Sequence, residues 1–301
     1  MNVLITGGTG FIGTALQNYI LSQGGTVHYL TKKSNKIVTT THVKGFLWDT
    51  TNKYIDPKAF EGIDCIVNLA GKSINCPWTT KNKNAILSSR INASQTLFEY
   101  LEKNNHSIRQ IVHASAIGIY PSSINRCYTE DETHINPEFL GKVCKNWEAE
   151  NRKFETLDIT NTFIRIGMVL SKDGGALPEM TNLVKKGIGK KMGSGKQMYS
   201  WIHREDLIRM IYFLLHKKLG GIFNAVSSQP ITQQKLNTSL ADHFNKSFIV
   251  PKIPEFLFKT VLGERSALIL DSQKVSSEKI SNKGFVFDFL DIHSALINIY
   301  K

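Results

Sequence analysis

The chain has 301 residues, of which 41% are hydrophobic and 21% are charged. These proportions are typical of globular proteins and exclude a wholly disordered, collagen-like or coiled-coil chain. The length is twice the ~150 residues of a typical domain, which allows one large α/β domain with an appendage or two modest domains. The net charge of +12 favours anionic partners. Because the basic residues form no arginine-rich run, an anionic cofactor ranks ahead of nucleic acid.

The chain offers no sign of export, membrane insertion or metal binding. No segment approaches the ~18 consecutive apolar residues of a membrane span, and no basic segment precedes the N-terminal glycines. The cysteines form no C-x-x-C pair and show no metal-ligand spacing; they are Cys65, Cys76, Cys127 and Cys144. We therefore expect a cytoplasmic protein with reduced thiols, no metal site, and no membrane or nucleic acid as partner.

Short apolar runs alternate with helix patterns over most of the chain. An apolar run over residues 1–6, a glycine turn, a helix pattern through Leu21 and a second β run over 26–31 form a βαβ unit, whose strands are parallel. The alternation continues with predicted strands over 43–47, 64–71, 110–115, 161–166 and 222–225, and predicted helices over 84–103, 139–154 and 205–215. This pattern predicts a Rossmann-like, doubly wound parallel sheet.

The pattern loosens after Gly167 and changes again in the last quarter of the chain. We expect residues 1–225 to form a nucleotide-binding Rossmann domain, with substrate-region insertions after 167, and residues 226–301 to form a small, mostly helical C-terminal cap. The stretch 185–196 carries five lysines among four glycines. It is open to two interpretations, a clamp for an anionic substrate or a solvated loop.

The glycine turn after the first strand has the spacing of a phosphate-binding loop. Residues 7–13 fit both G-x-G-x-x-G and G-x-x-G-x-x-G, between a predicted strand and a predicted helix. Such glycines let the backbone approach a pyrophosphate, which then lies at the helix N-terminus. The predicted cofactor residues of this turn are Gly7, Gly10, Phe11, Ile12 and Gly13.

The end of the second strand indicates which dinucleotide is bound. NAD-specific folds place an acidic residue there to bind the ribose 2′-hydroxyl. This chain has no acidic residue before Asp49, and its second strand ends with Thr31 and Lys32. A lysine suits a 2′-phosphate and the threonine can donate a hydrogen bond to it, so we predict NADP rather than NAD. A solvated loop is the alternative interpretation of Lys32.

Further motifs make the chain resemble the atypical, extended short-chain dehydrogenases/reductases. The segments that carry the resemblance are NLAG at 68–71, SR at 89–90, ASAIGIY at 114–120, VCKNWE at 143–148, DGG at 173–175, GSG at 193–195, SWIH at 200–203, LGE at 262–264 and QKV at 273–275. The chain is most similar to the sugar-nucleotide-epimerase-like family with a short C-terminal domain of unknown function. This resemblance covers essentially the whole chain and implies an NADP-binding Rossmann fold, without implying a substrate.

The resemblance also implies further cofactor contacts. It places Leu69, Ala70 and Gly71 beneath the ribose, Arg90 as a basic contact and Met168 where the chain passes the nicotinamide. A helix-surface arginine is the alternative interpretation of Arg90.

The catalytic pair of short-chain reductases is missing. These enzymes use Tyr-x-x-x-Lys on the helix after the fifth strand, where the lysine lowers the tyrosine pKa. The matching positions, counted from Ser115, hold Phe139 and Val143. The candidate substitutes for the catalytic pair are Tyr120, His203 and Ser115. Each also has a structural interpretation. Tyr120 would be a packed aromatic residue of a loop, His203 would cap or hydrogen-bond a nearby loop, and Ser115 would cap the end of its strand.

Two classes of function remain open from the sequence. The first is an NADP-dependent oxidoreductase or epimerase-like enzyme that acts on a carbonyl or carbinol group of a small molecule, where anionic small molecules are among the candidate substrates. The second is a non-catalytic NADP-binding protein that senses redox state or regulates a partner. Nucleic-acid binding ranks third, because no motif interleaves aromatic and basic residues.

Overall fold

The computed structural model describes residues 1–301, which divide into two compact units. Unit 1 comprises Met1–Ala116, Glu138–Arg165 and Ile208–Phe223, and unit 2 comprises Ile117–Pro137, Ile166–Leu207 and Asn224–Lys301. Each unit is therefore assembled from three separate stretches of the chain.

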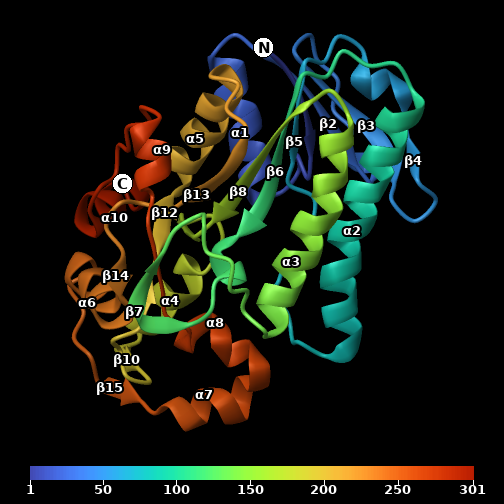
Figure 1. The fold of residues 1–301 in the computed structure, drawn as a ribbon. Coiled ribbons are helices and arrows are strands. Elements are labelled where there is room, and N and C mark those ends of the chain that lie inside the picture. Colours follow the sequence, from blue (N-terminus) through green and yellow to red (C-terminus); the bar gives the residue numbers. More distant parts are fainter. The chain divides into compact units, whose positions relative to one another are not determined.

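An eight-stranded sheet underlies unit 1, in the order β13-β8-β6-β5-β1-β2-β3-β4 (Figure 1). β1 pairs in parallel with β2 and β5, β2 with β3, and β5 with β6, whereas β4 is antiparallel to β3. The strands are β1 Asn2–Thr6, β2 Thr26–Thr31, β3 Val43–Asp49, β4 Tyr54–Ile55, β5 Cys65–Asn68, β6 Gln110–Ala116, β8 Thr160–Ile166 and β13 Gly221–Ala225. This order confirms the predicted doubly wound, mostly parallel sheet.

Helices cover both faces of this sheet. α2 (Thr80–Lys103) and α3 (Phe139–Asn151) lie side by side on one face, and α1 (Phe11–Ser22) and α5 (Arg204–His216) lie on the other (Figure 1). α2 begins four residues before the predicted boundary because the Thr79 hydroxyl accepts a hydrogen bond from the Asn82 N–H and caps it. α3 ends at Asn151, and residues 152–156 continue as a 3₁₀ turn.

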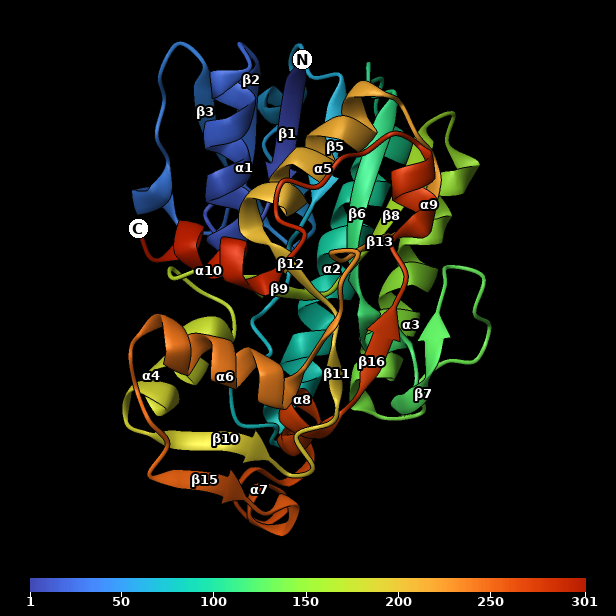
Figure 2. The ribbon, with the colours of Figure 1, turned by 90° about the vertical axis from the view of Figure 1, so that its left-hand side faces the viewer.

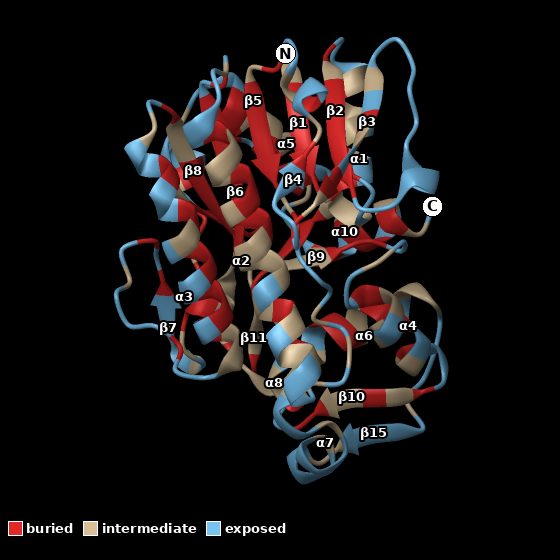
Figure 3. Ribbon diagram, turned by 90° about the vertical axis from the view of Figure 1, so that its right-hand side faces the viewer, coloured by how far each residue is buried: buried red, intermediate tan, exposed pale blue.

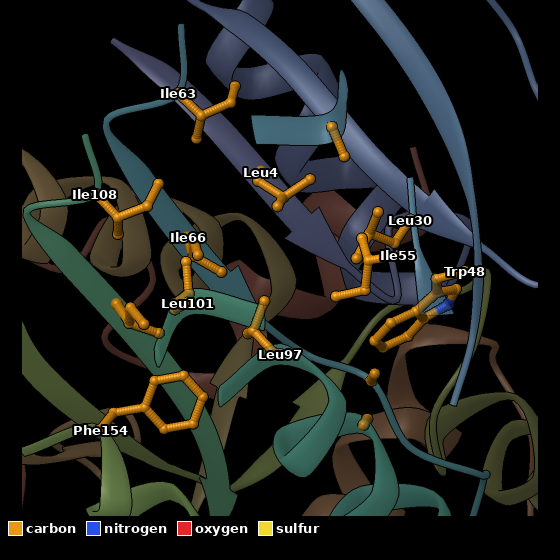
Figure 4. Close-up of a cluster of buried hydrophobic side chains, with 14 of the residues drawn as sticks. Leu4, Leu30, Trp48, Ile55, Ile63, Ile66, Leu97, Leu101, Ile108 and Phe154 are labelled. Carbon is orange, nitrogen blue, oxygen red and sulfur yellow. The ribbon is translucent and has the colours of Figure 1, made fainter. Parts of the chain in front are cut away.

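A core of apolar side chains fills the space between the sheet and α2 (Figure 4). Leu4 and Ile66 come from the central strands, and Leu97 and Leu101 face them from α2. All four are at most 2% exposed. Burying a side chain of this size stabilises the fold by about 1.5–3 kcal/mol, so this core fixes the sheet on which the candidate site is built.

Unit 2 contains small sheets and short helices. Its sheets are ordered β14-β11-β16-β7, β10-β15 and β12-β9. The strands are β7 Ser123–Tyr128, β9 Met168–Leu170, β10 Ile188–Met192, β11 Met198–Tyr199, β12 Trp201–His203, β14 Ile231–Thr232, β15 Val250–Ile253 and β16 Gln273–Val275, and the helices are α4 Leu177–Lys185, α6 Gln233–His243, α7 Glu255–Leu262, α8 Ala267–Leu270, α9 Glu278–Asn282 and α10 Ile292–Ile299. A second apolar core joins α4, α6 and α10 around Leu177, Leu236 and Leu296. Figure 2 shows the three helices that carry these residues.

None of these helices is both long enough and apolar enough to span a lipid bilayer.

Candidate functional site

The glycine turn joins β1 to α1 in a conformation that depends on its glycines. Gly7 has a left-handed φ of +70°, and its carbonyl accepts a hydrogen bond from the Gly10 N–H at 3.0 Å. A Cβ on Gly13 would lie 2.3 Å from the Gly7 carbonyl oxygen, so only glycine allows α1 to approach the turn this closely. α1 starts after Gly10 without a side-chain cap. A helix N-terminus of this kind suits a phosphate group.

A buried threonine ties the end of β1 to the end of β5, beside this turn. The Thr6 hydroxyl donates to the Asn68 side-chain oxygen at 2.7 Å and accepts from the backbone N–H groups of Leu69 and Ala70, each at 3.1 Å. A Cβ on Gly7 would lie 3.0 Å from the Leu69 carbonyl oxygen. The structure therefore brings the predicted contacts of the turn and of the β5 end together, in the register that the sheet imposes.

Thr31 and Lys32 lie at the carboxyl end of β2, the next strand of the sheet. The Lys32 side chain is exposed, and its ammonium donates to the Thr50 hydroxyl at 2.6 Å. The Thr31 hydroxyl is buried and accepts from the Lys33 N–H at 3.2 Å. Lys32 therefore lies at the end of β2, where a 2′-phosphate was predicted to bind, and in this structure its ammonium contacts Thr50 of a neighbouring loop.

Arg90 and Gly71 meet where the chain leaves β5. The Arg90 guanidinium donates to the Lys72 carbonyl at 3.0 Å and to the Ile86 carbonyl at 2.9 Å, and lies 4.9 Å from the Trp147 ring centroid. A Cβ on Gly71 would lie 2.9 Å from the guanidinium carbon. Burial lowers the pKa of Arg90. This arginine is therefore packed between α2 and α3, at the edge of the predicted cofactor contacts.

The positions of the missing tyrosine and lysine are apolar in the structure. The Phe139 ring packs edge-on against Trp78 at 4.9 Å, and the Lys83 ammonium lies 5.4 Å from its centroid. Val143 is 4% exposed. The adjacent Cys144 is no substitute, because burial raises the pKa of its thiol to about 12 and keeps it protonated near neutral pH. None of these three positions offers an acid for a proton transfer near neutral pH.

Ser115 belongs to a buried ion-pair network in unit 1. Its hydroxyl donates to Glu148 Oε1 at 2.6 Å, and Arg165 forms two hydrogen bonds to the same carboxylate, at 2.9 and 3.0 Å. All three residues are at most 5% exposed. The network joins β6, α3 and β8. In this network the Ser115 hydroxyl is hydrogen-bonded to Glu148, which is the arrangement expected of a serine with a structural role.

Tyr120 is a packed aromatic residue of unit 2. It is 1% exposed, its ring stacks on Tyr128 with centroids 5.3 Å apart, and its hydroxyl donates to the Asn224 side-chain oxygen at 2.7 Å. The Asn224 N–H donates in turn to Glu130. The hydroxyl thus belongs to a buried polar network, which is costly to interrupt.

His203 ends β12 in unit 2 and is buried as well. Its ring stacks on Phe289 with centroids 3.8 Å apart, and Nδ1 accepts from the Glu205 N–H at 3.1 Å. Burial lowers the pKa of His203 to about 4, the Arg204 charge adds to this effect, and the Asn298 side chain opposes it. The imidazole is therefore neutral near pH 7 and, with Nδ1 as acceptor, carries its proton on Nε2.

Met168 lies at the start of β9 in the same unit. It pairs with Trp201 across β9 and β12, and its N–H donates to the Ser200 carbonyl at 2.9 Å. Met168, Tyr120 and His203 therefore share one compact unit, whereas Ser115 belongs to the other.

The sequence analysis assigned no role to the residues that support these groups. Thr6, Asn68, Glu148 and Arg165 are all buried polar or charged residues. A charged residue in an apolar strand, such as Arg165, signals a buried partner, because an unpaired buried charge is very costly. That signal was available in the sequence.

We expect Tyr120→Phe to lower the free energy of unfolding by about 1–3 kcal/mol, because the change leaves the Asn224 side-chain oxygen without its donor in a buried place. Urea unfolding measures this loss, and NADPH affinity should stay unchanged. A tenfold fall in kcat at wild-type stability, once a substrate is known, would instead favour Tyr120 as a proton donor.

The fold and the glycine turn define a Rossmann-like α/β protein. The model of the NAD dependent epimerase/dehydratase family matches residues 3–225, and that of a domain of unknown function, DUF1731, matches residues 253–299. An epimerase family protein of Staphylococcus epidermidis is 36% identical over 99% of this chain and 98% of its own length. The chain belongs to the NAD dependent epimerase/dehydratase family.

Solved structures agree with this membership. Human epimerase family protein SDR39U1, crystallised with NADPH, superimposes with a TM-score of 0.85 at 27% identity and 99% coverage of both chains. A nucleoside-diphosphate sugar epimerase of Corynebacterium glutamicum has a TM-score of 0.79 at 26% identity; the match covers 99% of this chain and 58% of that one. Structures 15–18% identical, some in complex with NAD, show the shared fold alone.

Proposed function

We propose that the protein binds NADP and transfers hydride to or from a carbonyl or carbinol carbon of a small molecule, as an oxidoreductase or epimerase-like enzyme. The observation that carries the proposal is the glycine turn, which lies against the Leu69–Ala70 backbone at the carboxyl ends of β1 and β5. Open α/β sheets bind ligands at this edge. The NADPH in the human relative's crystal structure supports the same cofactor.

The residues of unit 1 fit an NADP molecule. Gly7, Gly10 and Gly13, with the first turn of α1 at Phe11 and Ile12, would hold the pyrophosphate. Thr31 and Lys32 would bind the 2′-phosphate, with Leu69, Ala70, Gly71 and Arg90 at the nicotinamide ribose. The bound nicotinamide would supply the hydride. Residues 1–225 would form this cofactor domain, with Met168 beside the nicotinamide and residues 226–301 as the cap over the substrate.

A proton donor must come from outside the Phe139/Val143 pair. Phenylalanine and valine at 139 and 143 cannot transfer protons, and Ser115 is bonded to Glu148. Tyr120 and His203 are the remaining candidates, and the neutral His203 imidazole can donate a hydrogen bond from Nε2 to a substrate oxygen. Both side chains are buried in unit 2.

A second function is favoured by the apolar character of the α3 positions. Phe139 is packed by Trp78, and Val143 is buried, so the usual proton-transfer pair is absent. A protein that binds NADPH and does no chemistry, as a redox sensor or a regulator of a partner, is the alternative that this observation supports.

Turnover separates the two functions. NADPH oxidation would be followed at 340 nm, in the presence of about micromolar protein, with small ketones and aldehydes, anionic carbonyl compounds and nucleoside-diphosphate sugars. Oxidation with one substrate class supports the enzyme. Tight NADPH binding without turnover of any class supports the sensor, and absence of nucleotide binding contradicts both.

Lys32→Ala is expected to weaken NADPH binding at least tenfold and leave NADH binding nearly unchanged. A charge-assisted hydrogen bond to the 2′-phosphate, worth about 1.5–3 kcal/mol, would be lost, and NADH has no such phosphate. Isothermal calorimetry with both nucleotides measures the effect. Lys33→Ala is the matched control, one residue farther along an exposed loop. An equal loss of affinity for NADPH and NADH in Lys32→Ala would contradict the assignment.

A further inference from the structure

The most exposed apolar side chains of unit 2 include a group on β15, on the residue just before it and on α7. Ile249, Phe256 and Val261 are 82%, 64% and 77% exposed, and Val250 and Leu257 lie beside them in the chain at 43% and 42%. We call these five residues the β15–α7 surface. Figure 3 shows both elements almost wholly in the exposed colour. Large apolar side chains concentrated in this way mark an interaction surface more often than isolated ones do.

α7 is an apolar helix that packs only loosely on its own unit. None of its eight residues is buried, and Phe258 and Leu262 are its only half-buried ones. At 100° per residue, Phe256, Leu257 and Val261 share the outward side of the helix with Thr260. The polar residues Glu255 and Lys259 form an ion pair on a different side, at 2.7 Å. The outward face is therefore apolar.

Basic residues are frequent in the stretches that carry this surface. β15 pairs in parallel with β10, which brings Lys191 opposite Lys252. The two stretches that build this part of the unit, 185–196 and 246–265, hold nine basic and two acidic residues. Their net charge of +7 is more than half of the chain's +12, in about a tenth of its length. Exposed apolar side chains on a strongly basic part of the chain are complementary to a surface that is apolar inside and anionic outside.

The positive charge of these stretches distinguishes between the possible partners of the β15–α7 surface. Two copies of this chain meeting through the same surface would bring their positive charges together, which opposes association. β10, β15 and α7 lie together at one end of unit 2 (Figure 2), where a broad, deformable partner can reach them. Helices with apolar residues on one side and lysines around them adsorb to the headgroup region of anionic bilayers.

We propose that the β15–α7 surface docks peripherally on an anionic lipid bilayer. Phe256, Leu257 and Val261 enter the headgroup region, and the lysines of β10 and β15 contact lipid phosphates. The lack of a spanning helix, from which we expected no membrane partner, concerns insertion across a bilayer and not adsorption to its surface. The docking is independent of the cofactor and of the proposed enzyme activity.

Co-sedimentation of the full chain with vesicles tests the proposal. We expect at least tenfold more binding to vesicles of phosphatidylglycerol and phosphatidylcholine than to phosphatidylcholine alone, and a marked decrease when salt rises from 50 to 300 mM, about a twofold change in Debye length. The Phe256→Asp/Val261→Asp variant should lose this binding at unchanged melting temperature, since both side chains are exposed. Lys252→Gln should weaken it without altering the apolar face.

Val286→Asp is the matched control, because Val286 is 70% exposed in the same unit and lies outside β15 and α7. It should bind vesicles like the wild type. Equal binding to neutral and anionic vesicles, no vesicle binding at all, or equal losses in the control and the α7 variant would each overturn the proposal. Binding to polyglutamate without binding to anionic vesicles would also overturn it and assign the surface to an acidic protein partner.

Discussion

Gly13→Ala is expected to distort the turn between β1 and α1 and to abolish NADPH binding. The new Cβ would lie 2.3 Å from the Gly7 carbonyl oxygen and 2.7 Å from the Gly8 Cα, and both of these are backbone atoms. Neither can rotate away, so α1 must move relative to β1. Overpacking of this kind costs about 1–3 kcal/mol of stability. Urea unfolding and isothermal calorimetry with NADPH measure the two effects.

Gly10→Val separates the loss of binding from the loss of fold. A Cβ on Gly10 would meet a single atom, the Gly7 carbonyl oxygen, at 3.1 Å. We therefore expect a folded protein with a melting temperature near that of the wild type. NADPH binding should nevertheless be lost, because the valine side chain would occupy the space in which the backbone meets the pyrophosphate. Normal NADPH binding by Gly10→Val would exclude this turn as the phosphate site.

The Rossmann-like sheet was predictable because its signals are local. The strand over 26–31 is the observed β2, and the pattern of strand, glycine turn, helix and strand leaves one plausible pairing, since crossovers are right-handed. The predicted start of α2, four residues too late, also has a local cause. Thr79 caps the helix ahead of a polar first turn, where the apolar periodicity on which the prediction depended had not yet begun.

The strands of unit 2 were not predicted because their pairing is non-local. β7 has mostly exposed residues, and its partner β16 lies about 150 residues further along the chain. β11 is two residues long and joins β14 and β16. Strands this short have no periodicity of their own, and their formation depends on neighbours that one sequence segment does not contain.

The candidate site shows the same difference between local and non-local signals. Sheet topology alone places the predicted cofactor residues of β1, β2 and β5 at one edge, and the structure has them there. The predicted catalytic roles depend on side-chain partners, which the sequence does not give. The hydroxyl of Ser115 is bonded to a glutamate 33 residues away, and that of Tyr120 to an asparagine 104 residues away. Those roles remain predictions.

Glu148→Ala is expected to lower the free energy of unfolding by about 3–5 kcal/mol, the usual cost of removing one member of a buried ion pair. Arg165 would lose a carboxylate that it contacts through two hydrogen bonds, and Ser115 would lose its acceptor. The network joins β6, α3 and β8, so the loss loosens the helix that carries Phe139 and Trp147. Urea unfolding at constant pH measures the change.

The exposed pair Arg152–Glu155 provides the control for this prediction. Its residues are half exposed and three apart on the chain, so Glu155→Ala should cost at most about 1 kcal/mol. Ser115→Ala should fall between the two, at about 1.5–3 kcal/mol, because it removes one hydrogen bond to a charged group and leaves the ion pair intact. If Glu148→Ala cost no more than Glu155→Ala, the buried network would not hold α3 on the sheet. If Ser115→Ala kept full stability and instead lowered kcat, Ser115 would act on a substrate, as the sequence suggested, and not as an anchor for Glu148.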